Sequence, residues 1–423
     1  MLRVSRLRAC LEPDGLERLV AAFEDRQLTA SASRLSRWEY GRSGASFRLL
    51  RAYEEGAGLP PYLLFALNDR QRRAAEDTFA ASPTIDPTEG ISADDVYEIL
   101  DRAVLCQEVT GSDWYALASF ATANGYFYLS PDNTRLIARR LLEELARSIG
   151  SGYILRFEAL HLFALLDRIQ GAMIAELSTM IAEGGTGTIG EAASLMLRTA
   201  PEVSRALVEQ LRSSDTYAAR ESAHWIEDIL RDRAPVADPP LKRAEVLARR
   251  EQICEELPPW ATARLETEVT KPLVVTALAG RSRLLRHEAS LLLMSGDVGE
   301  EISRTVLDAF EAEEDPVWRT RLAQFHEYLI PPRDPDRLEA LALAEEDPED
   351  RRALWNSRAH TLVPIQRGPA VLEQLKDPET QGAVSSALGL TGSVDAALLA
   401  RTDLADVHPV LDWWQDRGPA LVY

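Results

Sequence analysis

The residues that decide how the chain is interpreted form one short run, Ser31-Ala-Ser-Arg-Leu-Ser-Arg-Trp-Glu-Tyr-Gly-Arg42. Ser31 suits the start of a helix, because its hydroxyl can accept a hydrogen bond from a free backbone N–H of the first turn. Gly41 stands where the chain must leave the helix, since glycine adopts the left-handed C-terminal conformation without steric cost. The run therefore predicts a helix over residues 31–40.

This predicted helix has two unlike faces at 100° per residue. Leu35 and Trp38 lie on one side together with Ser31 and Glu39. Arginine can form two hydrogen bonds to guanine, and hydroxyls can bond to base edges or to phosphates. The pattern suits the DNA major groove, although by itself it is equally typical of a solvated surface helix. The polar face consists of Ser33, Ser36, Arg37 and Tyr40, with Arg34 at its edge.

The neighbouring residues resemble the helix-turn-helix family of the Xre, Cro and λ-repressor type. In that family the second half of the motif runs Val-Ser-x-Ser-x-Ile-Ser-x-hydrophobic-Glu-x-Gly, and this chain has Ala30-Ser-Ala-Ser-Arg-Leu-Ser-Arg-Trp-Glu-Tyr-Gly41. The segments Phe47–Glu54 and Gly58–Tyr62 also resemble that family's fourth helix and the turn into its fifth. The resemblance covers roughly residues 1–70. Thr29 departs from it by standing where the family has a glycine, which implies a longer or differently phased second helix.

The resemblance implies a five-helix DNA-binding domain over residues 1–80 that acts as a sequence-specific transcriptional regulator. Its helices are expected at 3–11, 15–27, 31–40, about 46–56, and from Pro60, a residue suited to a helical start. Leu35 and Trp38 would hold the third helix to its own domain. The partner would be double-stranded DNA, bound by a homodimer at half-sites about one DNA turn apart. The implied DNA-binding residues are Ser33, Arg34, Ser36 and Arg37 toward the bases, Thr29, Tyr40, Arg42 and Ser43 toward the backbone, and the cap Ser31.

The distribution of charge fits this division of the chain. The net charge is −20, which by itself opposes binding to phosphates. Residues 1–80, however, hold 13 Arg against 11 Asp and Glu, a net charge of +2, so the other 343 residues carry −22. Positive charge is therefore concentrated near the predicted recognition helix, and the remainder of the chain is acidic.

Composition places the chain in the ordinary globular class, with 46% hydrophobic and 27% charged residues among 423. No apolar run approaches the ~20 residues that span a bilayer, and no signal-peptide core follows Met1. The three cysteines are Cys10, Cys106 and Cys254, far apart and odd in number. They argue against a disulfide framework and favour a reducing cytoplasm without membrane attachment.

A linker is predicted at residues 81–91, where two prolines and a glycine occur in ten residues. From residue 92 to 423 almost every segment has helical periodicity, and no alternating strand pattern is convincing. The fold class is therefore all-α. We expect residues 92–423, which we call the body, to regulate the DNA-binding domain, or head. The body would dimerise two heads, bind a small-molecule or peptide effector, or recruit a protein.

A degenerate repeat of about 32 residues runs through this body. Arg286-His-Glu-Ala289 is followed by Asp315-Pro-x-x-Arg319 and Asp347-Pro-x-x-Arg351, and then by Asp377-Pro378. The period and the Asp-x-x-x-Arg start resemble HEAT-like α-solenoids. In such a repeat the aspartate can cap a helix and the arginine can bridge to the neighbouring unit. Helix pairs without a strict repeat remain the alternative.

No catalytic or cofactor-binding constellation stands out. Gly185-Thr-Gly-Thr-Ile-Gly190 matches the dinucleotide fingerprint, but that motif works between a strand and a helix, and the preceding residues have a helical pattern. The six histidines stand far apart, so structural roles are favoured over metal binding. We expect no enzyme activity, no cofactor and no metal. The alternatives are a helical-repeat protein–protein scaffold or host-defence component with a DNA-binding head, and an enzyme that uses the glycine-rich loop.

Overall fold

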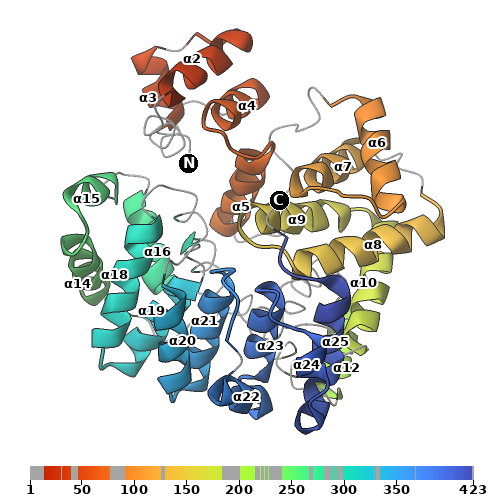
Figure 1. Ribbon diagram of the computed structural model, residues 1–423. Helices are drawn as coiled ribbons and strands as arrows, with labels where there is room; N and C mark the ends of the chain where they lie inside the picture. The colour runs from red at the N-terminus through yellow and green to blue at the C-terminus, as the bar shows by residue number, and fades with distance from the viewer. Residues whose placement is uncertain are drawn as a thin grey trace. The chain divides into compact units, whose positions relative to one another are not determined.

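The computed structural model describes the helical elements and their connections but not every residue. The described residues are 14–29, 31–39, 46–76, 91–124, 129–182, 201–214, 220, 223, 227, 241–265, 270–280, 286, 289, 290, 293, 299–327, 329, 334–366 and 368–421. All regular elements in these ranges are helices, so the predicted all-α class is confirmed (Figure 1). None of these helices is long and apolar enough to cross a membrane. The predicted first helix at 3–11 lies outside the described ranges.

The contacts divide the chain into two compact units, Met1–Leu177 with Leu421–Tyr423, and Ser178–Ala420. The first unit begins with the helices 15–25, 32–39 and 47–56. Each of them lies within two residues of the bounds predicted from the sequence. The fifth predicted helix begins at Leu63 rather than at Pro60, because Tyr62 has a φ of 67°, which is incompatible with a right-handed helix. The helices of this unit are α2 Gly15–Asp25, α3 Ala32–Glu39, α4 Phe47–Gly56, α5 Leu63–Glu76, α6 Ala93–Val104, α7 Gly111–Asn124, α8 Pro131–Ala146, α9 Gly150–Phe163 and the start of α10 Asp167–Ala182.

Helices α2 and α4 pack closely because a glycine lies at their contact. A Cβ added to Gly56 would lie 2.6 Å from the Cα of Leu19, so no other residue fits there without moving α2. Phe23 of α2 and Tyr53 of α4 are buried, with their rings edge-to-face and their centroids 5.3 Å apart. Helix α3 packs on this apolar contact through Trp38, whose ring stacks on that of Phe23.

A buried carboxylate organises the rest of the first unit. Glu144 of α8 accepts hydrogen bonds from the indole Nε1 of Trp114 at 2.7 Å and from the Nε of Arg156 at 3.1 Å. Its other oxygen accepts from the Nε of Arg140 at 2.7 Å. Buried polar groups need such partners, because an unpaired one costs the free energy of desolvation. One side chain thus connects α7, α8 and α9.

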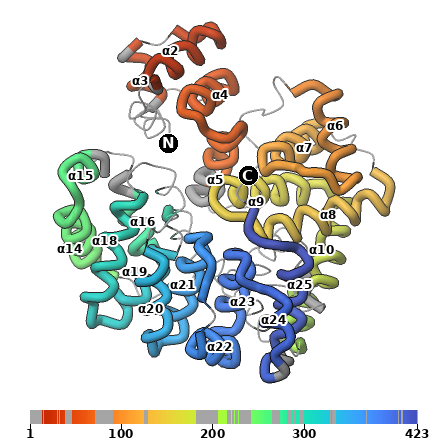
Figure 2. The backbone as a smooth tube through the Cα atoms, in the orientation of Figure 1, coloured from red at the N-terminus to blue at the C-terminus, as the bar shows by residue number. Residues whose placement is uncertain are grey.

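The second unit is a series of helix pairs in which alternate helices pack on one another. Helix α19 contacts α21, α21 contacts α23, and α23 contacts α25, while α18, α20 and α22 each contact the helix that follows them (Figure 2). The helices are α12 Pro201–Arg212, α14 Arg243–Glu255, α15 Pro259–Leu265, α16 Thr270–Ala279, α18 Gly299–Ala312, α19 Pro316–Glu327, α20 Pro335–Ala344, α21 Pro348–Ala359, α22 Pro369–Lys376, α23 Gln381–Leu390, α24 Ala396–Leu399, the short 3-10 helix η2 Thr402–Val407, and α25 His408–Arg417.

Two of the three aspartates of the predicted repeat begin helices, whereas Asp377 follows the end of α22 and α23 begins only at Gln381. Asp315 accepts from the backbone N–H of Val317 at 2.9 Å, at the start of α19. Asp347 accepts from the N–H of Glu349 at 2.9 Å, at the start of α21. Each satisfies donors that the first turn of a helix leaves without an intrahelical partner.

The arginines of the repeat join one helix pair to the next. Arg319 donates to the backbone carbonyl of Glu313 at 3.3 Å, and Arg351 donates to that of Glu345 at 2.8 Å. Each guanidinium also reaches an acid of the following pair, so it ties its own loop to its neighbour. The acids at 313, 345 and 377 stand 32 residues apart, and the ion pairs are Arg249–Glu313, Arg319–Glu345 at 2.7 Å and Arg351–Asp377 at 2.9 Å.

The C-terminal helix covers the last of these pairs. Gly389 of α23 lies under the indole of Trp414 in α25, so closely that an added Cβ would lie 1.9 Å from the ring. Trp413 and Trp414 stand edge-to-face, with centroids 5.0 Å apart, and Trp414 is buried. Helix α25 is therefore held against one face of α23.

Candidate nucleic-acid interface

Helix α3 begins as its sequence predicts. The Oγ of Ser31 accepts a hydrogen bond from the backbone N–H of Arg34 at 3.3 Å and lies 3.3 Å from the Oγ of Ser33. The carbonyl of Ser31 accepts from the N–H of Leu35 at 2.9 Å. The cap therefore fixes the first turn, which carries two of the predicted DNA contacts.

An aromatic stack holds α3 to the helices beneath it. The ring of Trp38 lies on that of Phe23, with centroids 6.2 Å apart and planes inclined by 19°. Trp38 and Leu35 are both half-buried. The two residues predicted as anchors thus face their own domain, and the opposite side of α3 faces outward.

The predicted DNA-contacting residues within the described ranges lie mostly on this outward side. Thr29, Ser31, Ser33, Arg34 and Arg37 are exposed, and only Ser36 is half-buried. No ion pair joins Arg34 or Arg37 to an acid in the described parts of the chain. Arg34 donates one long hydrogen bond of 3.5 Å to the carbonyl of Thr29, so both guanidinium groups can still bind a ligand. The predicted backbone contacts Tyr40, Arg42 and Ser43 lie outside the described residues.

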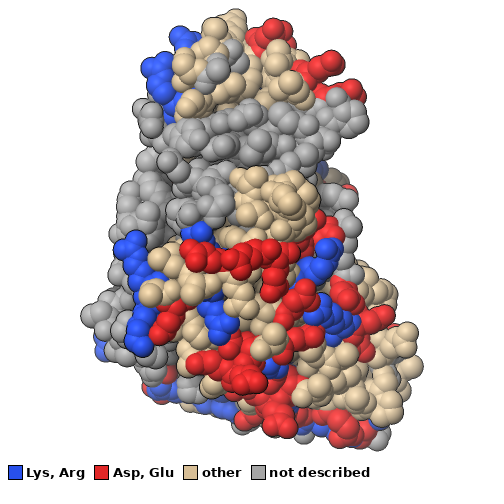
Figure 3. Space-filling model, turned by 90° about the vertical axis from the view of Figure 1, so that its left-hand side faces the viewer, with Lys and Arg blue, Asp and Glu red and all other residues tan. Residues whose placement is uncertain are grey.

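Three exposed acidic side chains of this region lie on α2, away from the arginines of α3. Glu17, Glu24 and Asp25 of α2 are exposed, whereas Arg26 is paired with Glu55 at 2.5 Å. At the top of Figure 3, the region of α2–α4 carries Lys and Arg on one edge and Asp and Glu on the other. A polyanion would be attracted to the arginine edge and repelled by the acidic one, which orients its approach.

The structure adds a residue that the sequence gave no reason to select. Glu54 of α4 is buried, and its carboxylate accepts from the backbone N–H of Tyr62 at 2.9 Å and of Leu64 at 2.8 Å, at the start of α5. Arg51 donates to it at 2.6 Å and also lies over the Tyr62 ring, 4.9 Å from its centroid. Burial raises the pKa of Glu54 to about 7, against the lowering effect of Arg51.

The contacts of Glu54 and Arg51 with Tyr62 connect helices α2–α4 to the remainder of the first unit. The ring of Tyr62 stacks on that of Tyr115 in α7, with centroids 5.9 Å apart. The Oγ of Ser112 donates to the carbonyl of Pro61 at 2.8 Å, and the hydroxyl of Tyr115 donates to Asp69 at 3.2 Å. Helix α5 thus shares a core with α7 and α9. The predicted linker at 81–91 lies almost wholly outside the described residues, so the boundary there stays a prediction.

Within the described residues no group of three or more His, Cys, Asp or Glu side chains could hold a metal ion. His326 is buried between the hydroxyls of Ser303 and Ser357, each 2.9 Å from a ring nitrogen, and burial lowers its pKa to about 3. It is a neutral core histidine. The glycine-rich run 185–190 lies outside the described residues.

Comparison of the chain with protein-family models, with curated proteins and with solved structures gives no match.

Proposed function

We propose that the protein is a sequence-specific DNA-binding transcriptional regulator, with α3 as its recognition helix in the major groove. The observation that carries this proposal is the arrangement of α3, whose Trp38 is stacked on Phe23 while Arg34 and Arg37 face outward without acidic partners among the described residues. Arginines so placed can each give two hydrogen bonds to a guanine. Ser33 adds an exposed hydroxyl on the same side.

The cap formed by Ser31 and the contact of Glu54 with the start of α5 support the same proposal. Readout of base edges requires that the reading side chains be held by a fixed helix. Ser31 fixes the start of α3, and Glu54 fixes the direction in which α5 leaves α4. The recognition helix is thus attached to a defined scaffold rather than to a loop.

The body, in this proposal, is a HEAT-like α-solenoid that regulates or dimerises the heads. The alternate packing of α19, α21, α23 and α25 supports this classification, as does the 32-residue recurrence of the Arg–acid contact. Repeats of this kind are stabilised mainly by contacts between neighbours. Two heads on one dimer would read two half-sites about one DNA turn apart.

Selection of bound sequences from random duplex DNA tests the proposal. The full-length protein should enrich a palindromic or direct-repeat motif whose half-sites are about 10 base pairs apart, centre to centre. An Arg34→Ala/Arg37→Ala double variant should enrich nothing, and Arg205→Ala, which removes an exposed arginine from α12, should enrich the same motif. Failure of the parent protein to enrich any motif would exclude sequence-specific binding. Genome-wide binding without discrete peaks would then favour the scaffold alternative.

A further inference from the structure

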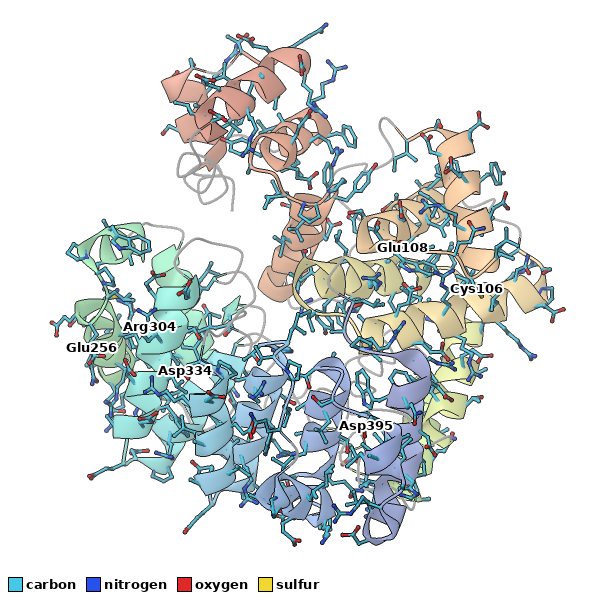
Figure 4. All side chains as sticks on the ribbon, in the orientation of Figure 1. Cys106, Glu108, Glu256, Arg304, Asp334 and Asp395 are labelled. Atoms are coloured by element: carbon cyan, nitrogen blue, oxygen red, sulfur yellow. The ribbon has the colours of Figure 1, made fainter. Side chains whose placement is uncertain are left out.

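A cavity of about 100 Å³ lies among α18, α19 and the start of α20 in the second unit. Figure 4 shows Arg304 on α18 and Asp334 at the start of α20, and both side chains line the cavity. Leu307 and Leu338 contribute apolar wall. A site that offers a cation, an anion and a little apolar surface in so small a volume selects for small polar molecules that carry both charges.

The guanidinium of Arg304 is available to a ligand. Its side chain is 60% exposed, and the acid nearest to it, Glu300, lies 3.5 Å away. At that distance and exposure the pair contributes little free energy, so a ligand anion can replace it at low cost.

The carboxylate of Asp334 is available in the same sense. One oxygen caps α20 by accepting from the backbone N–H of Arg337 at 3.1 Å, and the second oxygen has no further partner among the described residues. The side chain of Arg337 does not compete for it, because Asp308 and Glu311 hold that guanidinium at 2.6 and 2.7 Å. Arg304 therefore remains open at the cavity as the cation and Asp334 as an anion, while Glu300, which also lines the cavity, is the acid that a ligand carboxylate would displace from Arg304.

The floor of the cavity is polar but uncharged. The Oγ of Ser303 lies 2.9 Å from the Nε2 of His326, and the Nδ1 of His326 lies 2.9 Å from the Oγ of Ser357. Both ring nitrogens are occupied in this network, and the ring is fully enclosed. The floor thus adds no net charge to the cavity.

We infer that this cavity binds a small zwitterionic α-amino acid, with its carboxylate on Arg304 and its ammonium group on Asp334. The volume limits the ligand, since a cavity of about 150 Å³ holds benzene, which has six heavy atoms. The cavity of about 100 Å³ is smaller, but it opens to solvent beside Arg304, whose side chain is 60% exposed, so we expect glycine or alanine to fit and larger side chains not to fit. This inference does not depend on DNA binding.

Isothermal titration calorimetry of the full-length protein tests the inference directly. Glycine and L-alanine should bind. L-Alaninamide, which lacks the carboxylate, and propionate, which lacks the ammonium group, should each bind about threefold to fivefold more weakly, because each leaves one partly exposed charged group without its partner. L-Phenylalanine should give no heat of binding. Absence of binding by glycine and alanine at millimolar concentration, or equal binding of alanine and its two analogues, would overturn the inference.

Two substitutions assign the charged groups. Arg304→Gln and Asp334→Asn should each weaken alanine binding about threefold to fivefold, and asparagine preserves the cap of α20. Arg304→Gln should also abolish the preference for alanine over alaninamide, and Asp334→Asn the preference over propionate. The matched controls are Arg401→Gln, an exposed arginine paired with Asp403, and Asp395→Asn, the cap of α24; both should bind alanine as the parent does. Thermal melting establishes that each variant is folded, and full affinity in folded Arg304→Gln or Asp334→Asn would refute the assignment.

Discussion

The indole of Trp38 rests on the phenyl ring of Phe23, and Phe23 in turn meets the ring of Tyr53 edge-on. Three aromatic side chains, one from each of α3, α2 and α4, thus form a continuous column. Because α3 is short and its other face is exposed, this column determines how the helix is presented. The orientation of Arg34 and Arg37 therefore depends on a residue that faces away from them.

Removal of the Trp38 ring should weaken DNA binding without removing a DNA contact. Trp38→Ala is expected to lower the free energy of unfolding by about 2 kcal/mol, less than for a fully buried tryptophan because Trp38 is half-buried. Trp38→Phe should restore most of the affinity. Urea unfolding and electrophoretic mobility shift on the selected DNA measure the two effects. Trp260→Ala on α15, where the side chain is 45% exposed, serves as the control. Unchanged DNA affinity in Trp38→Ala would show that the column does not position α3.

The side chain of Arg37 should confer specificity as well as affinity. Arg37→Ala is expected to cost about 1–3 kcal/mol on the selected site if the guanidinium forms two hydrogen bonds to a base. Binding to non-specific DNA should change little by comparison, and discrimination at one base pair should be lost. Titrations on the selected site and on single-base variants of it check this expectation. A uniform loss on all sequences would instead assign Arg37 to the phosphate backbone.

The buried carboxyl group of Glu54 should make stability depend on pH. Its pKa is about 7 in the folded protein and near its ordinary 4.5 when unfolded, so the folded state binds more protons between these values. The stabilisation is therefore complete below pH 4.5 and is lost as the pH rises through about 7, a change on the order of 3 kcal/mol. In Glu54→Gln this component should be absent. The difference in unfolding free energy between parent and variant, measured from pH 5 to 8, should fall with rising pH, and a constant difference would contradict the assignment.

The contact between Gly389 and Trp414 should not tolerate a methyl group. In Gly389→Ala the new Cβ would lie 1.9 Å from the indole, so α23 and α25 must separate, at a cost of about 3 kcal/mol. Gly171→Ala provides the matched control, because nothing lies within 4 Å of an added Cβ there and alanine favours the helix by about 0.5–1 kcal/mol. Thermal unfolding followed by circular dichroism distinguishes the two. Equal stability of the two variants would show that the tryptophan repacks freely.

Local features of the fold were predictable from the sequence, and contacts between distant residues were not. Ser31 predicted the start of α3, because a cap acts on residues within one helical turn, whereas Gly41 lies outside the described residues. Likewise, Asp315 and Asp347 predicted helix starts, since each bonds to an N–H two positions along the chain. These signals are local and chemical, so a single sequence is sufficient to find them.

The missed features depend on approach in space. Glu54 meets N–H groups eight and ten residues away, and it does so only because Tyr62 has a positive φ, which neither its residue type nor its neighbours predict. The same turn explains why α5 begins at Leu63 and not at Pro60. The contact of Gly389 with Trp414 joins two helices with α24 and η2 between them, and a glycine inside a helical pattern does not indicate its partner.

The Arg–acid contacts of the second unit have a consequence for how the gene can change length. Arg319 and Arg351 occupy equivalent positions, and so do the acids that they bind, Glu345 and Asp377. Deletion of the 32 codons from Arg319 through Asp350 would therefore place Arg351 after Asp315 and leave Asp377 in register to receive it. Duplication of the same block would lengthen the row with matched partners at both junctions. A block of 32 residues is therefore the unit by which this row of Arg–acid contacts keeps its register when the chain shortens or lengthens.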